Sequence, residues 1–307
     1  MNHLVTGNLK LWAKIANVQS IRVPGYWTHR KGYSIKVGSA PQPEEKVLYH
    51  LHGSGYTVQS AHPKDPTALV AKGFLEVVGP VTRIFAVEYR LASGKPFKTE
   101  HPFPTQLLDA LAGYNYLVNV VRIAPENIII IGDSAGGNLA HALIRYLTEY
   151  QGTTDVPLLG PPGALVLISP WMDLGMTHQS LPNGSAKKFV SSDYLDTPED
   201  GVPYAQNAFT GPHGLGAAET NPYISPASLH PGLIVDFKNF PRTFIVAGGA
   251  EMLYDSIKRH IRIAWSEIWA RVMGQGQMKG KFDIMKLRMP FMIICSFPGT
   301  SRREQIP

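Results

Sequence analysis

The residues best placed to do chemistry surround Ser134, which lies in the spacing glycine–x–serine–x–glycine. Gly132 and Asp133 precede the serine, and Ala135 and Gly136 follow it. An apolar run comes before the motif and a segment of helical periodicity comes after it, as at a sharp strand-to-helix turn. The two glycines relieve crowding there, so that the serine is strained and its hydroxyl exposed. We therefore predict Ser134 as a nucleophile; the alternative is a tight turn with a capping serine.

A second glycine-rich stretch, His52-Gly53-Ser54-Gly55, follows another apolar run. Backbone N–H groups at the end of a strand can point at an oxyanion, the charged oxygen that develops when a carbonyl is attacked. We predict that the amides of Gly53 and Ser54, with that of Ala135, form such an oxyanion hole. His52 is expected to hold the loop through hydrogen bonds, and Gly55 belongs to the same motif. The alternative is an ordinary glycine turn.

Short apolar runs alternate with helix-length segments along the chain. The runs show no strict alternation of polarity, which is typical of strands buried on both faces. They cover residues Lys46–Leu51, Arg83–Glu88, Asn127–Ile131, Ala164–Ile168 and Thr243–Ala247. The helical segments are Phe103–Val121, Asn138–Tyr150 and Ser256–Met273. This order predicts an α/β fold, a mostly parallel sheet with helices on both faces.

Two regions interrupt this rhythm. Residues 1–45 precede the first good strand and include an amphipathic stretch at Leu9–Ile15. Residues 174–240 are rich in Gly, Pro, Ser and Asn and show little periodicity. Because an irregular insertion of this length is usually functional, we predict a lid or cap from about 1–45 and 174–240 on a single domain, 1–307.

The two motifs together resemble the hormone-sensitive-lipase family of α/β-hydrolases. Their amino-acid sequence is most similar to that of the fungal esterases of this family. Further segments that resemble the family are Tyr89-Arg90-Leu91, Pro102-Phe103-Pro104, Ser169–Asp173 and Asn221–Pro226. The resemblance covers roughly residues 45–270. It implies the α/β-hydrolase fold and a serine esterase or lipase that needs no cofactor and no metal.

The acid of a Ser–His–acid triad should follow the serine in chain order, after a later strand. The family has D-P-L-x-D at this place, and Glu251-Met252-Leu253-Tyr254-Asp255 resembles it, with Glu for the first Asp. The resemblance therefore implies Glu251 as the acid that orients a histidine. Asp255 is the alternative acid, although it could equally be a residue of the first helical turn, where negative charge is favoured.

The base is the missing member of the triad. It should be a histidine in a loop tens of residues after the acid, but residues 261–307 contain none. The last histidine, His260, lies in a helical segment only nine residues after Glu251. The other histidines fall in strands, helices, loops or the lid, where geometry makes each a poor base. They are His3, His29, His50, His52, His62, His101, His141, His178, His213 and His230.

The C-terminal stretch, about 274–307, does not match the closing pattern of the family. We interpret it as an atypical tail of the kind that a mispredicted exon or a frameshift would produce, and sequencing the transcript would test this. Residues 275–307 carry +4 of the formal net charge of +6, and they hold the only cysteine, Cys295. The basic balance therefore says little about an acidic partner of the domain.

Composition excludes several classes of protein. Hydrophobic residues make up 44% of the 307 residues and charged residues 17%, which excludes a highly charged disordered chain. A single cysteine excludes an intramolecular disulfide and a zinc ribbon.

No basic helix or aromatic platform supports a nucleic-acid partner. No signal peptide and no apolar run long enough to span a bilayer is seen, so an intracellular, soluble protein is favoured. The oligomeric state stays open.

Two functions remain as hypotheses. The first is a serine carboxylic-ester hydrolase that acts through an acyl-enzyme on a small-molecule ester and is impaired by the missing histidine. The second is a catalytically dead small-molecule-binding protein. The plant gibberellin receptor resembles the same family and has lost its triad histidine while keeping the pocket. This sequence shares that loss.

Overall fold

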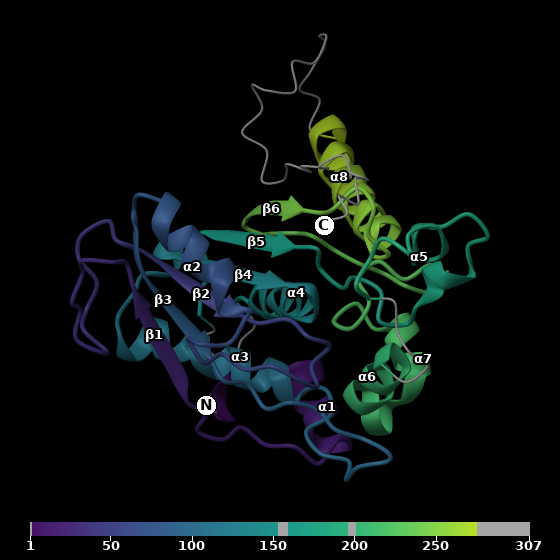
Figure 1. The fold of residues 1–307 in the computed structure, drawn as a ribbon, viewed down its shortest axis with the longest axis horizontal. Coiled ribbons are helices and arrows are strands. Elements are labelled where there is room, and N and C mark those ends of the chain that lie inside the picture. The colour runs from purple at the N-terminus through teal and green to yellow at the C-terminus, as the bar shows by residue number, and fades with distance from the viewer. Residues whose placement is uncertain (1, 153–158, 196–200, 275–307) are drawn as a thin grey trace, which may run out of the picture.

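The computed structural model describes residues 2–152, 159–195 and 201–274 and contains a six-stranded, twisted sheet (Figure 1). The strands lie in the order β1-β3-β2-β4-β5-β6. Their bounds are β1 Gly25–His29, β2 Lys46–Leu51, β3 Val81–Val87, β4 Ile128–Asp133, β5 Ala164–Ile168 and β6 Arg242–Val246. Only the edge strand β1 is antiparallel, paired with β3; the other neighbours are parallel.

Helices cover both faces of the sheet, as the sequence predicts. Strand β2 divides its side chains between them: Tyr49 and Leu51 pack in one core cluster, and Leu48 packs in the other. The larger cluster contains the apolar faces of α3 and α4, and the smaller one contains Ala71 and Leu75 of α2. The fold is therefore a three-layer α/β arrangement with two cores.

Eight α-helices occur within the described residues. They are α1 Gly7–Ile15, α2 Ala68–Val77, α3 Thr105–Asn115, α4 Ser134–Glu149, α5 Ser185–Lys188, α6 Gly201–Thr210, α7 Gly214–Thr220 and α8 Tyr254–Gly274. Shorter turns of helix are η1 Asn2–Leu4, η2 Tyr116–Val120, η3 Pro125–Asn127, η4 Thr177–Ser180 and η5 Gly211–His213. Helices α5, α6 and α7 lie beyond the ends to which β5 and β6 point (Figure 1).

The predicted strands are confirmed to within two residues at each end. One assignment was wrong: residues 25–29, placed in the lid, form the edge strand β1, because their backbone completes the ladder of β3. The helices α2, α5, α6 and α7 were not predicted, since their sequences lack a clear apolar period. The proposed tail from 275 onward lies outside the described residues.

Candidate active site

The nucleophile elbow joins β4 to α4. Ser134 is the first residue of α4 and has φ 48°, in the left-handed region that side chains other than glycine rarely adopt. A Cβ on Gly132 would lie 2.3 Å from the Gly136 carbonyl oxygen, and one on Gly136 would lie 2.0 Å from the Leu51 carbonyl oxygen. The turn thus accepts only glycine two positions before and two positions after the serine. The sharp strand-to-helix turn predicted from the motif is confirmed.

The loop after β2 lies directly beside this elbow, because Leu51 pairs with Gly132 across the sheet. Ser54 and Gly55 have φ 74° and 64°, so the chain turns back sharply there. A Cβ on Gly53 would lie 2.3 Å from Asp133 Oδ2, which leaves no room for a side chain at the point of closest approach.

Three amides at this junction could stabilise an oxyanion. Within the described residues, no turn or side-chain hydrogen bond uses the N–H groups of Gly53 and Ser54. Ala135 is fully buried in the first turn of α4, where an amide has no acceptor inside its own helix. The positive end of the helix dipole favours negative charge at the same place.

His52 lies beneath this loop as a buried structural group. Its ring stacks on Tyr89 with centroids 4.2 Å apart and an interplanar angle of 9°. Nδ1 is 3.1 Å from the Gly53 carbonyl oxygen, and the Tyr89 hydroxyl donates to the His52 carbonyl oxygen at 2.7 Å. Burial lowers the pKa of His52 to about 4, so the ring is neutral near pH 7. These contacts are those expected of a residue that shapes the loop.

Glu251, the predicted acid, lies in the loop between β6 and α8. Burial raises the pKa of its carboxyl group, while hydrogen bonds from the Ser169 hydroxyl and the Gly248 amide oppose that shift. Its Oε1 is buried and has no hydrogen-bond partner among the described residues. Ser169 and Gly248 therefore act on the carboxylate, while its Oε1 atom has no partner among the described residues. Sequence reasoning missed Ser169 as its partner, although the segment had been noted for its family resemblance.

Asp255, the alternative acid, is engaged elsewhere. Its Oδ2 accepts a hydrogen bond from the Ser185 amide at 2.7 Å, and its own amide donates to Ser185 Oγ at 3.0 Å. Asp255 lies in the first turn of α8 and joins that helix to α5. This reciprocal pair is the capping arrangement of a structural residue.

The histidines divide into buried structural groups and distant ones. His141 of α4 and His260 of α8 are in edge-to-face contact at 4.8 Å, and neither ring has a hydrogen-bond partner among the described residues. His50 Nε2 is 3.8 Å from Asp133 Oδ1, too far for a hydrogen bond. His178 pairs with Asp173 at 2.8 Å but lines a different pocket.

Ser134 opens into a cavity of about 510 Å³, within the range of ordinary ligand sites. Ser54 and Gly55 of the loop also line it. Most of the remaining wall is apolar. It comes from Trp171 after β5, from the predicted lid (Met176, Leu195, Val202 and Ala205) and from the loop after β6 (Met252 and Leu253). No histidine belongs to the described lining. The arrangement can hold an apolar acyl or alkyl group against the serine.

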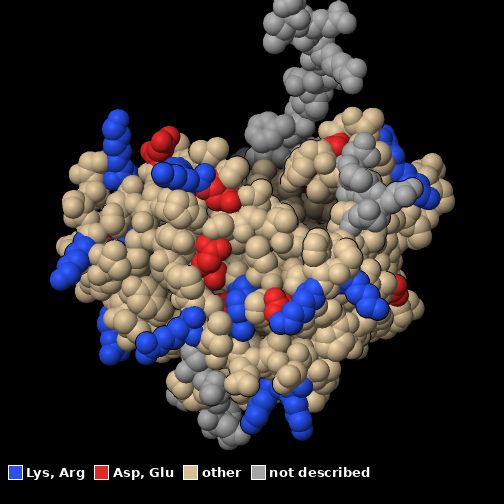
Figure 2. All heavy atoms as spheres, turned by 60° about the horizontal axis from the view of Figure 1, so that its bottom comes forward, with Lys and Arg blue, Asp and Glu red and all other residues tan. Residues whose placement is uncertain are grey.

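Other kinds of site receive no support from the described part of the chain. No group of three His, Cys, Asp or Glu side chains there could hold a metal ion. None of the helices described is long and apolar enough to cross a bilayer. On the face drawn in Figure 2, basic side chains are scattered over the surface with acidic ones among them, and tan surface separates most of them.

The sequence matches the profile of the alpha/beta hydrolase fold family over residues 48–263, most of the chain. The chain belongs to this family. The match contains the loop after β2, the elbow and the Glu251 loop, which are the three elements assembled above.

Curated relatives of this family member are named as hydrolases. An esterase of Acinetobacter venetianus is 29% identical over 79% of this chain and 66% of its own length. An acetyl-hydrolase of Streptomyces hygroscopicus is 29% identical over 69% of this chain and 60% of its own length. The chain thus spans less than two thirds of either relative.

Solved structures show the same fold. An esterase from the bacterial hormone-sensitive lipase family superposes with a TM-score of 0.59 at 25% identity, over 79% of this chain and 68% of that one. A hormone-sensitive lipase from a metagenome library gives 0.55 at 26% identity, over 80% and 72%. The resemblance to hormone-sensitive-lipase-like α/β-hydrolases is confirmed, while the likeness to fungal members stays a prediction.

Proposed function

We propose that the chain is a serine carboxylic-ester hydrolase that acts on small or medium acyl esters through an acyl-enzyme on Ser134. The observation that carries this proposal is the strained elbow, whose serine opens into an apolar cavity beside the amides of Gly53 and Ser54. The names of the relatives, esterase and acetyl-hydrolase, support the same chemistry.

The proposed reaction begins when Ser134 Oγ forms a bond to the ester carbonyl carbon and the carbonyl oxygen becomes an oxyanion. Amides of Gly53, Ser54 and Ala135 stabilise that oxygen, and one such donor is typically worth about 3 kcal/mol. Collapse of the tetrahedral intermediate expels the alcohol, which takes up a proton. Water then attacks the acyl-enzyme, releases the carboxylic acid and restores the serine hydroxyl.

The proposed reaction needs a group that accepts the hydroxyl proton of Ser134. The family's histidine would accept it, with Glu251 orienting that histidine, but no histidine lines the described cavity wall. We infer that a protein of this sequence passes the proton to water or buffer. It should then be several orders of magnitude slower than a member with a full triad, with residual catalysis from the oxyanion hole.

The same cavity favours a second candidate, a binding protein without catalysis. A formed apolar cavity of about 510 Å³ can bury a small ligand whether or not the serine is activated. The two candidates differ in one observable, namely whether a covalent acyl group reaches Ser134.

Hydrolysis of p-nitrophenyl butyrate by the 307-residue chain and by Ser134→Ala tests the proposal. Ser39→Ala, which removes a hydroxyl whose hydrogen bond to the Lys36 carbonyl oxygen is exposed, is the matched control. We expect slow p-nitrophenol release that falls to the buffer rate in Ser134→Ala alone. Intact-mass measurement should find a butyryl adduct on every variant except Ser134→Ala. Equal rates in all three proteins would contradict the hydrolase. Tight, unreacted binding of the ester in that case would support the second candidate.

A further inference from the structure

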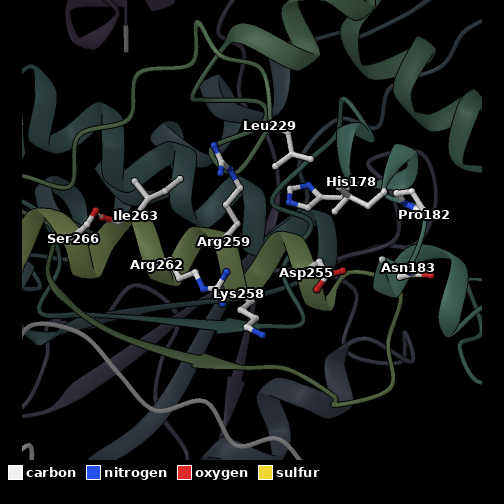
Figure 3. A pocket seen from close by; sticks show the side chains of 12 residues that line it. His178, Pro182, Asn183, Leu229, Asp255, Lys258, Arg259, Arg262, Ile263 and Ser266 are labelled. Atoms are coloured by element: carbon white, nitrogen blue, oxygen red, sulfur yellow. Dashed lines mark hydrogen bonds between the residues drawn. The ribbon is translucent and has the colours of Figure 1, made fainter.

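A second pocket, separate from the Ser134 cavity, lies between α8 and the segment that begins at η4 (Figure 3). Its volume of about 700 Å³ is that of a small-molecule site. None of its described lining residues also lines the Ser134 cavity. A ligand of this pocket would therefore be distinct from the ester proposed for the Ser134 cavity.

The wall from α8 is strongly basic. Lys258, Arg259 and Arg262 all line the pocket, and Asp255 is the acidic residue among the described lining residues. Asp255 already accepts a hydrogen bond from the Ser185 amide. Arg259 Nε donates to the Ser228 carbonyl oxygen at 3.2 Å, which fixes the guanidinium at the edge of the pocket. The charge at this wall favours an anion.

The opposite wall contains the imidazole ring of His178, which is fixed by hydrogen bonds. His178 is only 7% exposed, and its Nδ1 lies 2.8 Å from Asp173 Oδ2, which also accepts the His178 amide at 3.0 Å. Figure 3 shows the ring directed from its own segment toward α8. Nε2 has no hydrogen-bond partner within the described residues and is not sealed from solvent. A side chain more than nine-tenths buried thus points one free polar atom into the pocket.

Apolar side chains complete the lining of the pocket beside these polar groups. Leu181, Pro182, Leu229 and Ile263 line the pocket together with the basic residues. A ligand that satisfies both features carries negative charge at one end and a hydrocarbon body at the other. Residues 275–307, which follow α8 in the sequence, do not fit this description, because they carry a net charge of +4.

We propose that this pocket is a binding site for an organic phosphate monoester. Guanidinium and ammonium groups together match the doubly charged phosphate head, since Arg presents a planar fork of donors and Lys a compact charge. Lys258 and Arg262 contact the phosphate, Arg259 closes its edge, and Leu229 and Ile263 cover the apolar body. The site is independent of the chemistry at Ser134.

Isothermal titration calorimetry with hexyl phosphate tests the proposal, with inorganic phosphate and hexan-1-ol as probes of the two halves. Hexyl phosphate should bind at least tenfold more tightly than either. The double variant Lys258→Gln/Arg262→Gln should weaken its binding at least tenfold. The double variant Lys10→Gln/Lys14→Gln, which removes the same charge at the same spacing from exposed positions on α1, should change it less than twofold.

Three results would overturn the proposal: no binding of hexyl phosphate to the unchanged chain, an equal loss in both double variants, or full affinity in Lys258→Gln/Arg262→Gln. The last would place the ligand elsewhere, for example in the Ser134 cavity. Should the α8 double variant unfold at a lower temperature, the single variant at the exposed Arg262, Arg262→Gln, decides the question with an expected loss of about threefold.

Discussion

The elbow that holds Ser134 and the loop that holds Glu251 are both built after strands of one parallel sheet, yet they are built differently. At the elbow, backbone lies against backbone so closely that a single added carbon on Gly136 would meet the Leu51 carbonyl oxygen at 2.0 Å. In the acid loop, the Ser169 hydroxyl and the Gly248 amide favour the charged form of the carboxylate, and Oε1 is left without a described partner. The nucleophile is thus positioned by close packing of backbone from β2 against backbone of the elbow, while the acid lies beside the Ser169 hydroxyl, which follows β5, and the Gly248 amide of its own loop.

Two buried histidines connect these regions. His141 belongs to α4, the elbow helix, and His260 belongs to α8, the helix after the acid loop; their rings meet at 4.8 Å. Burial and the charge of Arg145 lower the pKa of His260 to about 3. The contact between the regions therefore needs neutral rings, unlike the packing around Gly132 and Gly136, where the nearest atoms to an added Cβ are all backbone atoms.

The largest expected effect is that of Gly136→Ala. Because the new methyl group would collide with the backbone of Leu51 and His52, the β2–β4 junction must shift, and we expect a loss of more than about 3 kcal/mol in the free energy of unfolding. Urea denaturation followed by circular dichroism measures it.

Gly73→Ala in α2 is the matched control, because a Cβ there has no neighbour within 4 Å. It should leave stability unchanged or raise it by up to about 1 kcal/mol. Equal unfolding midpoints for the two variants would show that the elbow is not packed as tightly as described.

The second prediction concerns the loss of stability at low pH that is due to His260. Between pH 6.5 and about 3 the unfolded chain protonates His260 and the folded chain does not, so stability is full above pH 6.5 and falls as the pH is lowered through this window. From pH 7 to pH 5 the loss due to this residue should be about 2 kcal/mol.

Urea unfolding at pH 7 and pH 5 compares the unchanged chain with His260→Leu, which removes the titrating group. The variant should lose about 2 kcal/mol less between the two pH values than the unchanged chain does. An identical pH dependence in both proteins would mean that His141 and His260 do not form a contact of two neutral rings between α4 and α8.

The smallest expected effect is that of Glu251→Gln on ester hydrolysis. In a working triad the acid acts through the histidine, and its loss costs about 10⁴ in rate. Because this sequence offers no histidine for Glu251 to orient, we expect less than a tenfold decrease in the rate of p-nitrophenyl butyrate hydrolysis.

Asp255→Asn serves as the comparison. It weakens the pair with Ser185, so it should cost about 1 kcal/mol of stability and leave the rate unchanged. If Glu251→Gln instead lowered the rate by several thousandfold, a histidine of this chain would be acting as base, and the contrast between the two regions would be wrong.

Much of the fold could be predicted from the sequence because its signals are local. Apolar runs locate the five parallel strands, and the spacing around Ser134 predicts the turn that the structure contains. β1 escaped prediction because Gly25–His29 is half-buried along its whole length and shows no apolar face. The helices α6 and α7 are short, and α6 contains a glycine and a proline while α7 contains two glycines, so their helical state depends on packing against the rest of the chain.

By itself, the sequence determined the nucleophile candidate, the glycine loop, the order of strands and helices along the chain, and the lack of a histidine after residue 260. Each of these follows from residue types and their order along the chain, without knowing which distant residues are in contact. Only the tertiary structure decided that Ser169 lies beside Glu251, that Asp255 is a capping residue, and that His178 faces the cations of α8. Those pairings join residues 70 or more positions apart in the sequence, and only packing of the sheet and its helices brings such residues together.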